Sequence, residues 1–180
     1  LTAEWKINAG NTLKYIWAKR DMNWDDALDL DGSPVPIAHT QRLSTYSQQS
    51  HELQLVGGAG PINYVAGLYT FKDDGFTNNP QNFFFGSATF DSRYGFTTKA
   101  NSAYGQLDYK LSDALTLTGG VRHTKEDKTV SRLLSAGTTP LIPAGTSAAT
   151  SFSSTTPMAS LGYKLSEQLS VYARYAEGFK

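Results

Sequence analysis

Alternation of apolar and polar side chains is the main structural signal in this chain. It is clearest in residues 104–111, 115–122 and 169–176, where every second side chain is apolar. A period of two is that of a β-strand with one dry face and one wet face. No segment has a helical period, and residues 25–30 could form a single helical turn at most. The pattern therefore predicts an all-β protein.

Eight segments have this strand-like character. Most exceed the mean length of about 5–6 residues for strands in soluble proteins. Several reach the roughly 9–11 residues with which a tilted strand crosses a bilayer. The predicted strands are residues 1–8, 12–20, 44–57, 62–72, 98–111, 115–126, 155–165 and 169–178.

The connections between these segments alternate between short and long. Short polar turns lie at residues 8–11, 57–61, 112–114 and 166–168, and long polar loops at 20–42, 72–98 and 126–155. Outer-membrane β-barrels have this asymmetry, with tight periplasmic turns and larger external loops. We therefore expect an antiparallel up-and-down meander that forms an open curved sheet, part of a transmembrane β-barrel.

The alternation also assigns side chains to the two faces of the sheet. In a barrel the dry face meets lipid and the wet face lines the lumen. The segment 62–72 is ambiguous, because Tyr64, Ala66 and Leu68 share one face while Val65, Tyr69 and Phe71 share the other. The predicted lipid-facing residues are Leu107, Tyr109, Leu117, Val121, Leu169 and Val171. The predicted lumen-facing residues are Gln106, Asp108, Arg122 and Arg174, with Asp108 as a structural ion-pair partner for the two arginines.

Composition narrows the class of protein. The 180 residues have zero net charge and no Cys. A neutral chain with scattered basic residues has no general attraction to nucleic acid, and absent Cys excludes disulfides and thiolate metal sites. The longest apolar runs, such as residues 83–85, fall far short of the ~18 residues of a membrane helix. A β-barrel needs no such run, because only alternate residues face lipid.

Several segments resemble successive barrel segments of TonB-dependent outer-membrane receptors, in the expected order and spacing. The sharpest is the Tyr-x-x-Tyr-x-x-Gly-Phe pattern that begins at Tyr172. Within that family the chain looks most like the receptors for iron complexes. The segments that carry the resemblance are residues 13–16, 50–55, 64–69, 104–109, 119–126 and 172–180.

The resemblance implies a barrel of about 22 strands with a plugged lumen. The chain starts at Leu1 without Met and ends inside a predicted strand, so we expect residues 1–180 to be a fragment of the barrel domain, without the plug domain and the terminal strands. The implied function is active uptake of a scarce nutrient complex across the outer membrane of a Gram-negative bacterium, with a ferric siderophore as the expected ligand. The implied partners are outer-membrane lipid, a small metal chelate and, through the missing plug, an inner-membrane energy-coupling protein.

Catalytic and metal chemistry find little support in the sequence. None of the three His residues lies in a recognisable nucleophile setting, so no enzyme is expected. The acidic segment 25–32 fails as an EF-hand, because Ala27 and Ala38 occupy the first and twelfth ligand positions. We therefore predict a solvated acidic loop, no metal site and no cofactor.

The long loop at 73–97 offers the best candidate for ligand capture. Exposed aromatic side chains beside an arginine can bind an aromatic, anionic chelate through ring stacking and charge. The alternative is that the phenylalanines pack the loop onto itself or dip into the lipid interface. The candidate ligand-binding residues are Phe83, Phe84, Phe85, Arg93 and Tyr94, with Phe90 on the same loop.

Two other classes of protein fit the alternation. One is a complete eight-stranded outer-membrane barrel with a structural or adhesive role, in which the first and last strands pair. The other is a soluble β-sandwich binding module, in which the predicted lipid-facing side chains are buried against a second sheet. An exposed apolar face on an open sheet would favour the receptor over both.

Overall fold

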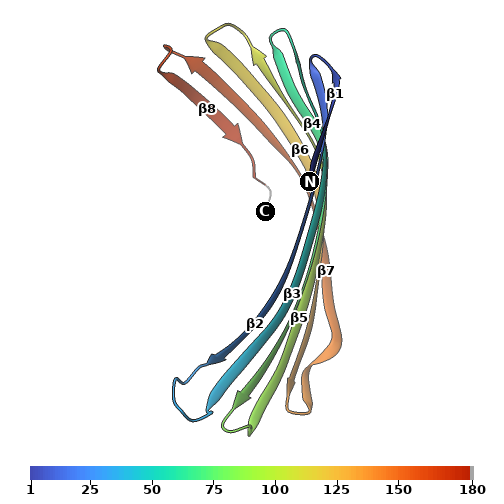
Figure 1. Cartoon of the computed structure of the whole chain (residues 1–180), viewed down its shortest axis with the longest axis vertical. Helices are drawn as coiled ribbons and strands as arrows, with labels where there is room; N and C mark the ends of the chain where they lie inside the picture. Colours follow the sequence, from blue (N-terminus) through green and yellow to red (C-terminus); the bar gives the residue numbers. More distant parts are fainter. Residues whose placement is uncertain (179–180) are drawn as a thin grey trace.

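A single antiparallel sheet contains all strands in the computed structural model of the protein, which describes residues 1–178. The eight strands are hydrogen-bonded in chain order, as an up-and-down meander without helices in the described residues (Figure 1). The prediction of an all-β antiparallel meander is confirmed. The strands are β1 (Thr2–Asn8), β2 (Asn11–Asp29), β3 (Ala38–Ala59), β4 (Ile62–Phe83), β5 (Ala88–Lys110), β6 (Leu115–Ala136), β7 (Thr139–Lys164) and β8 (Ser170–Ala176).

The strands β2 to β7 are much longer than the sequence predicts. They run from 19 residues in β2 to 26 residues in β7. The prediction of long loops at 20–42, 72–98 and 126–155 is therefore wrong, because most of these residues continue the strand ladders. True connections at this end are the tips at residues 30–37, 84–87 and 137–138. We call it the tip end, and the opposite end the short-turn end.

The extra strand length escaped detection because both faces of the sheet are polar there. Asp73 and Asp74 are neighbours on β4 and point to opposite faces, as do Asn78 and Asn79. With polar side chains on both faces, the period of two disappears from the sequence. The backbone hydrogen bonds continue all the same, and residues 25–29 pair with β3 instead of forming a helical turn.

The register settles which side chains share a face. Tyr64 lies opposite Leu107, and Leu107 lies opposite Gly119. Because cross-strand partners point to the same side, Tyr64, Ala66 and Leu68 join the face of Leu107, which resolves the ambiguity of segment 62–72. We call this the apolar face and the other the polar face. Toward the short-turn end, the strand residues of the apolar face include a band that we call the apolar band: Leu13, Tyr15, Trp17, Leu53, Leu55, Ile62, Tyr64, Ala66, Leu68, Ala103, Leu107, Tyr109, Leu115, Leu117, Val121, Pro157, Ala159, Leu161, Tyr163, Val171, Ala173 and Tyr175.

Three aromatic rings lie directly over glycines of a neighbouring strand. A Cβ built on Gly67 would lie 2.6 Å from the ring of Tyr104, and one on Gly75 would lie 2.3 Å from Phe96. On the apolar face a Cβ built on Gly57 would lie 2.7 Å from the ring carbon Cζ of Tyr64. The bare backbone of each glycine therefore provides the space in which a large ring lies flat across the sheet.

The sheet has two open edges and no packed core. In the described residues β1 pairs only with β2, β8 pairs only with β7, and no second sheet covers either face (Figure 1). The predicted lipid-facing residues are 37% to 55% exposed, Leu169 among them in the turn before β8. The closed eight-stranded barrel and the β-sandwich are both inconsistent with this arrangement.

Candidate ligand-binding surface on the polar face

A hydrogen-bonded network covers the polar face opposite the apolar band. The hydroxyl of Tyr104 donates to Glu52 at 2.6 Å, and the Gln54 amide donates to the same hydroxyl oxygen at 2.9 Å. The Arg122 guanidinium lies 5.6 Å from the centre of the Tyr104 ring and 5.4 Å from that of Tyr69. These contacts link β3, β4, β5 and β6 across the face and hold the arginine over aromatic surface.

The predicted lumen-facing residues all lie on this polar face. Asp108 lies opposite Thr118, whose hydroxyl donates to its carboxylate at 2.8 Å. Arg122 donates instead to the hydroxyl of Ser102 at 3.0 Å. The expected pairing of Arg122 with Asp108 is wrong. Arg122 lies opposite Tyr104, whereas Asp108 lies opposite Thr118, so hydroxyl and aromatic groups are the partners of the guanidinium. The other two members, Gln106 and Arg174, occupy β5 and β8 of the same face.

A second cluster lies on the polar face nearer the tip end, and we call it the Arg42–Tyr94 cluster. Arg42 of β3 forms a two-point ion pair with Asp26 of β2, at 3.2 and 2.7 Å. Arg132 of β6 stacks on the ring of Tyr94 of β5, 5.6 Å from its centre. Asp26, Arg42 and Tyr94 also line a hollow of about 270 Å³. Two arginines and one aspartate give the cluster a net positive charge.

Hydrogen bonding and charge shape the acid–base properties of this region. Hydrogen bonds from Arg42, aided by its charge, hold the pKa of Asp26 below its ordinary value. Burial, together with the negative charge of Asp73, raises the pKa of Tyr46 on the same face. Near neutral pH Asp26 is therefore a carboxylate and Tyr46 a neutral hydroxyl. Tyr46 also packs its ring against Phe96, with centres 6.2 Å apart.

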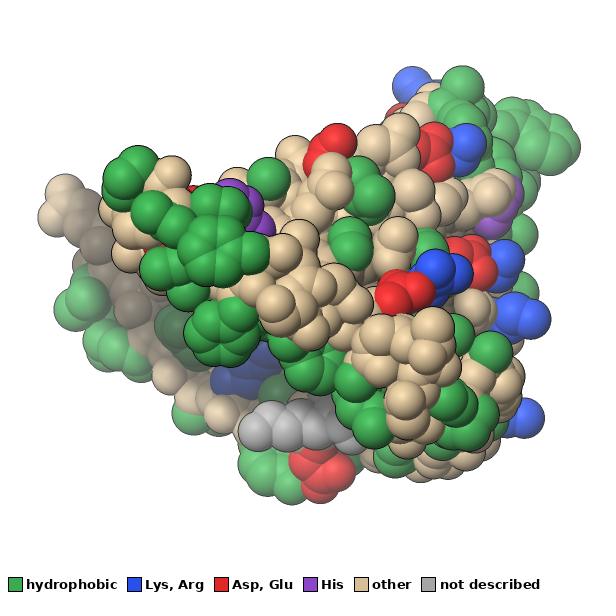
Figure 2. Space-filling view, turned by 90° about the horizontal axis from the view of Figure 1, so that it is seen from below, with side chains coloured by type: hydrophobic (Ala, Val, Ile, Leu, Met, Phe, Trp, Pro, Cys, Tyr) green, Lys and Arg blue, Asp and Glu red, His purple; other side chains and the backbone are tan. Residues whose placement is uncertain are grey.

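The predicted ligand-binding residues do not form one site. Phe84 and Phe85 lie at the β4–β5 tip and are 61% and 70% exposed. Phe83 packs edge-on against Phe90 on the polar face, with ring centres 6.0 Å apart. Arg93 points to the other face, where it pairs with Asp91 at 2.6 Å. Figure 2 views the molecule from the tip end, where hydrophobic side chains are spread over the surface and several acidic and basic side chains lie side by side.

Of that predicted set, only Tyr94 belongs to the Arg42–Tyr94 cluster. Sequence reasoning missed Asp26, Arg42 and Arg132, which lie on three different strands. All three have even residue numbers, and the even-numbered residues of β2, β3 and β6 point to the polar face. That signal could be used only once the long strands and their register were known.

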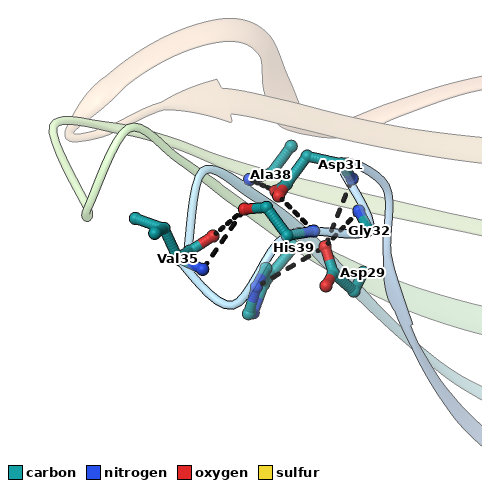
Figure 3. Close-up of polar contacts among 7 residues, drawn as sticks. Asp29, Asp31, Gly32, Val35, Ala38 and His39 are labelled. Carbon is teal, nitrogen blue, oxygen red and sulfur yellow. Dashed lines mark hydrogen bonds and ion pairs between the residues drawn. The ribbon is translucent and has the colours of Figure 1, made fainter.

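The β2–β3 tip brings Asp29, Asp31 and His39 together (Figure 3). One ligand atom from each lies within 4.8 Å of the others. The Asp31 carboxylate, however, accepts backbone N–H groups from Ser33 at 3.0 Å and from Ala38 at 2.7 Å. Asp29 likewise accepts from the backbone of Asp31 at 3.2 Å. The cluster is explained by the turn that it shapes. A hydrogen bond from the side chain of Ser33, aided by the backbone hydrogen bonds from Ala38 and Ser33, holds the pKa of Asp31 below its ordinary value.

The chain belongs to the TonB-dependent receptor β-barrel family. The family model described as "TonB dependent receptor-like, beta-barrel" matches residues 1–180. Proteins of this family lie in the outer membrane of Gram-negative bacteria, and that is the location of this chain. No helix among residues 1–178 has the length and apolar character needed to cross a membrane. No curated protein sequence matches the chain.

Several solved structures share this fold, and they are named as receptors or transporters for iron complexes or siderophores. The ferric yersiniabactin uptake receptor FyuA of Yersinia pestis superposes with a TM-score of 0.81 at 19% identity, over 96% of this chain and 26% of the receptor. The ferric citrate transporter FecA gives 0.65 at 14% identity, over 96% and 25%. The siderophore receptor PiuA of Acinetobacter baumannii gives 0.66 at 12% identity, over 97% and 31%. The chain thus spans between a quarter and a third of these receptors.

Proposed function

We propose that residues 1–180 form a central part of the barrel wall of a receptor that takes up a ferric siderophore. The apolar face would meet lipid and the polar face would line the lumen. The plug domain and the remaining strands would lie in other parts of a longer chain. Energy would come from an inner-membrane complex acting through that plug, and no catalytic step is involved.

The observation that carries this proposal is the Arg42–Tyr94 cluster. It puts two arginines and an aromatic ring on the polar face, beyond the level of the apolar band. In a closed barrel that position is the outer mouth of the lumen. An aromatic, anionic ferric chelate fits a ring with adjacent guanidinium groups, through stacking of its aromatic groups and through charge.

Binding of a ferric siderophore to the full-length receptor tests the proposal. Arg132→Gln removes the guanidinium that stacks on Tyr94 and keeps a polar side chain. Because hydrogen bonds to charged groups contribute about 1.5–3 kcal/mol, we expect binding to weaken about 10- to 100-fold. Arg93→Gln is the matched control, since it removes the same charge at the same end of the sheet but on the apolar face.

The proposal fails if Arg132→Gln binds ferric siderophores as tightly as the parent. Equal loss in both arginine variants would indicate a general charge effect in place of a site. Energy coupling is measured separately, as uptake of a radioactive iron chelate by whole cells. We expect uptake to stop when the proton gradient of the inner membrane is dissipated, while binding at the surface continues.

A further inference from the structure

A hollow of about 700 Å³ lies on the apolar face near the tip end, and we call it the wall hollow. Pro80 of β4 lies at its centre, since the register puts Gln41 of β3 on one side of it and Asp91 of β5 on the other. These side chains point away from the Arg42–Tyr94 cluster, which is on the polar face. The side chains that define the wall hollow are Gln41, Asn78, Pro80, Asn82, Asp91 and Arg93.

The wall hollow lies well beyond the apolar band. Pro80 is twelve positions farther along β4 than Leu68, the last aliphatic residue of the band on that strand. At about 3.3 Å per residue and a tilt near 45°, the hollow is roughly 28 Å from the band. Lipid headgroups extend only about 5–8 Å beyond the hydrocarbon. A ligand of the wall hollow therefore comes from the aqueous exterior and not from the bilayer.

A proline on a central strand forms the floor of the wall hollow. Proline has no N–H for a ladder and is usually confined to edge strands or bulges. The pairing of β3 with β4 is interrupted at Pro80. The carbonyl of Gln41 accepts a hydrogen bond from the side chain of Asn79 instead, at 2.7 Å. Irregular ladders of this kind often lie beside functional sites.

Polar groups of both kinds surround the proline ring. Arg93 donates to the Asp91 carboxylate through Nε at 3.0 Å and makes a second contact at 2.6 Å. The Gln41 amide donates to Asp25 at 3.1 Å, which leaves its oxygen as an acceptor. Oδ1 of Asn78 is buried and has no hydrogen-bond partner among the described residues. The wall hollow therefore offers donors and acceptors without excess charge, because the carboxylate and the guanidinium offset each other.

We propose that the wall hollow binds a neutral saccharide of the cell exterior. A sugar ring has apolar C–H faces and hydroxyl groups that both donate and accept, which matches an apolar floor surrounded by planar polar side chains. The hollow spans roughly 13 Å along β4 from Asn78 to Asn82 and about 10 Å across β3 to β5. That area holds a mono- or disaccharide. The proposal goes beyond siderophore uptake, because the wall hollow lies on the face opposite the one proposed to line the lumen.

The test uses the full-length receptor in a zwitterionic detergent without a sugar headgroup. The probes are an array of neutral di- and trisaccharides of glucose, galactose, mannose and N-acetylglucosamine, and a delipidated bacterial surface polysaccharide. The variant Asn82→Ala/Asp91→Ala is expected to bind the array saccharides about 10- to 100-fold more weakly. The matched control is Asn101→Ala/Asp127→Ala, which removes an amide and a carboxylate from the apolar face outside the hollow and should bind as the parent does.

Binding of the free saccharides or of the delipidated polysaccharide, lost in the first variant only, supports the proposal and identifies the source of the sugar. No binding of either probe would overturn it, as would equal losses in the variant and the control. Binding of neutral peptides from a parallel array, with no saccharide bound, would also overturn it.

Ferric siderophore binding by the same proteins separates this proposal from the proposed function. Lost saccharide binding with normal siderophore binding supports the wall hollow and shows that the variant is folded. If the parent binds no siderophore, the proposed function fails alone, and an unchanged thermal midpoint in detergent shows that the variant is folded.

Discussion

Glycines beneath aromatic rings determine how the polar face is built. Gly67 allows the Tyr104 ring to lie across β4 and reach Glu52 on β3, two strands away. A side chain at that position would lift the ring and break the link. Gly119 on β6 offers a contrast, because a Cβ built there has no neighbour within 4 Å.

Substitution at Gly67 should therefore be costly, whereas substitution at Gly119 should not. Gly67→Ala puts a methyl group into the space of the Tyr104 ring, and overpacking of this kind costs about 1–3 kcal/mol. We expect a lower urea midpoint for the receptor in detergent with Gly67→Ala and little change with Gly119→Ala. Equal midpoints for the two variants would contradict this account of the ring.

The Asp26–Arg42 ion pair gives a prediction for pH. Because the pKa of Asp26 is lowered in the folded protein, its contribution to stability is present above the unfolded pKa of about 3.9. It is lost as the pH falls through the folded pKa. Arg42→Gln should raise the pKa of Asp26 toward its ordinary value, as measured by carboxyl ¹³C NMR.

Asp21 is the internal control for that titration. Its pKa is also lowered, by hydrogen bonds from Lys19 and Ser47 and not from Arg42. Arg42→Gln should leave the titration of Asp21 unchanged. A shift of both carboxyl groups together would point to a change in the whole hairpin.

At the scale of elements, the β4–β5 hairpin has an unusual tip. Phe84 and Phe85 have positive φ angles of 50° and 60°, a region that costs non-glycine residues about 1–2 kcal/mol each. Their N–H groups donate to the carbonyls of Ile37 at 2.7 Å and of Pro36 at 3.2 Å. The tip is thereby tied to the β2–β3 tip, and two large rings are held exposed.

Replacing both residues by Phe84→Asn/Phe85→Gly should relieve that strain, since Asn-Gly is favoured in such turns. We expect slower amide hydrogen exchange at the end of this hairpin. If the rings also contact the ligand, as the sequence predicts, siderophore binding should weaken in the same variant. Slower exchange with normal binding would leave the rings without a role in capture.

At the scale of the whole molecule, the main feature is that many large hydrophobic side chains are exposed. Of the hydrophobic side chains in the described residues, Ala100 is buried, whereas Leu107, Leu117 and Val121 are 44% to 51% exposed. The edges β1 and β8 also present unpaired backbone groups. An open sheet with a bare apolar face needs lipid, detergent or further strands to cover it.

Residues 1–180 expressed alone should therefore aggregate in water. Size-exclusion chromatography with light scattering should show large particles without detergent and a smaller, defined species with it. A monodisperse monomer in plain buffer would contradict the exposed apolar face. The full-length receptor in detergent is the reference for the intact barrel.

The sequence alone determined the β class, the strand number and the apolar face near the short turns. It could do so because one face of the sheet is apolar and the other polar along the band. Apolar and polar side chains therefore alternate in the sequence there, as in Leu107, Asp108 and Tyr109. Only the tertiary structure decided the strand lengths beyond the band, because a paired strand with two wet faces has no period to detect.

The structure likewise decided which distant side chains meet. Register placed Tyr64 with Leu107, and it put Arg42, Tyr94 and Arg132 on the polar face while turning Arg93 away. A shift of one residue would reverse every such assignment. Register depends on the hydrogen bonds between consecutive strands along the whole length of each hairpin. The pattern within one strand does not encode that pairing.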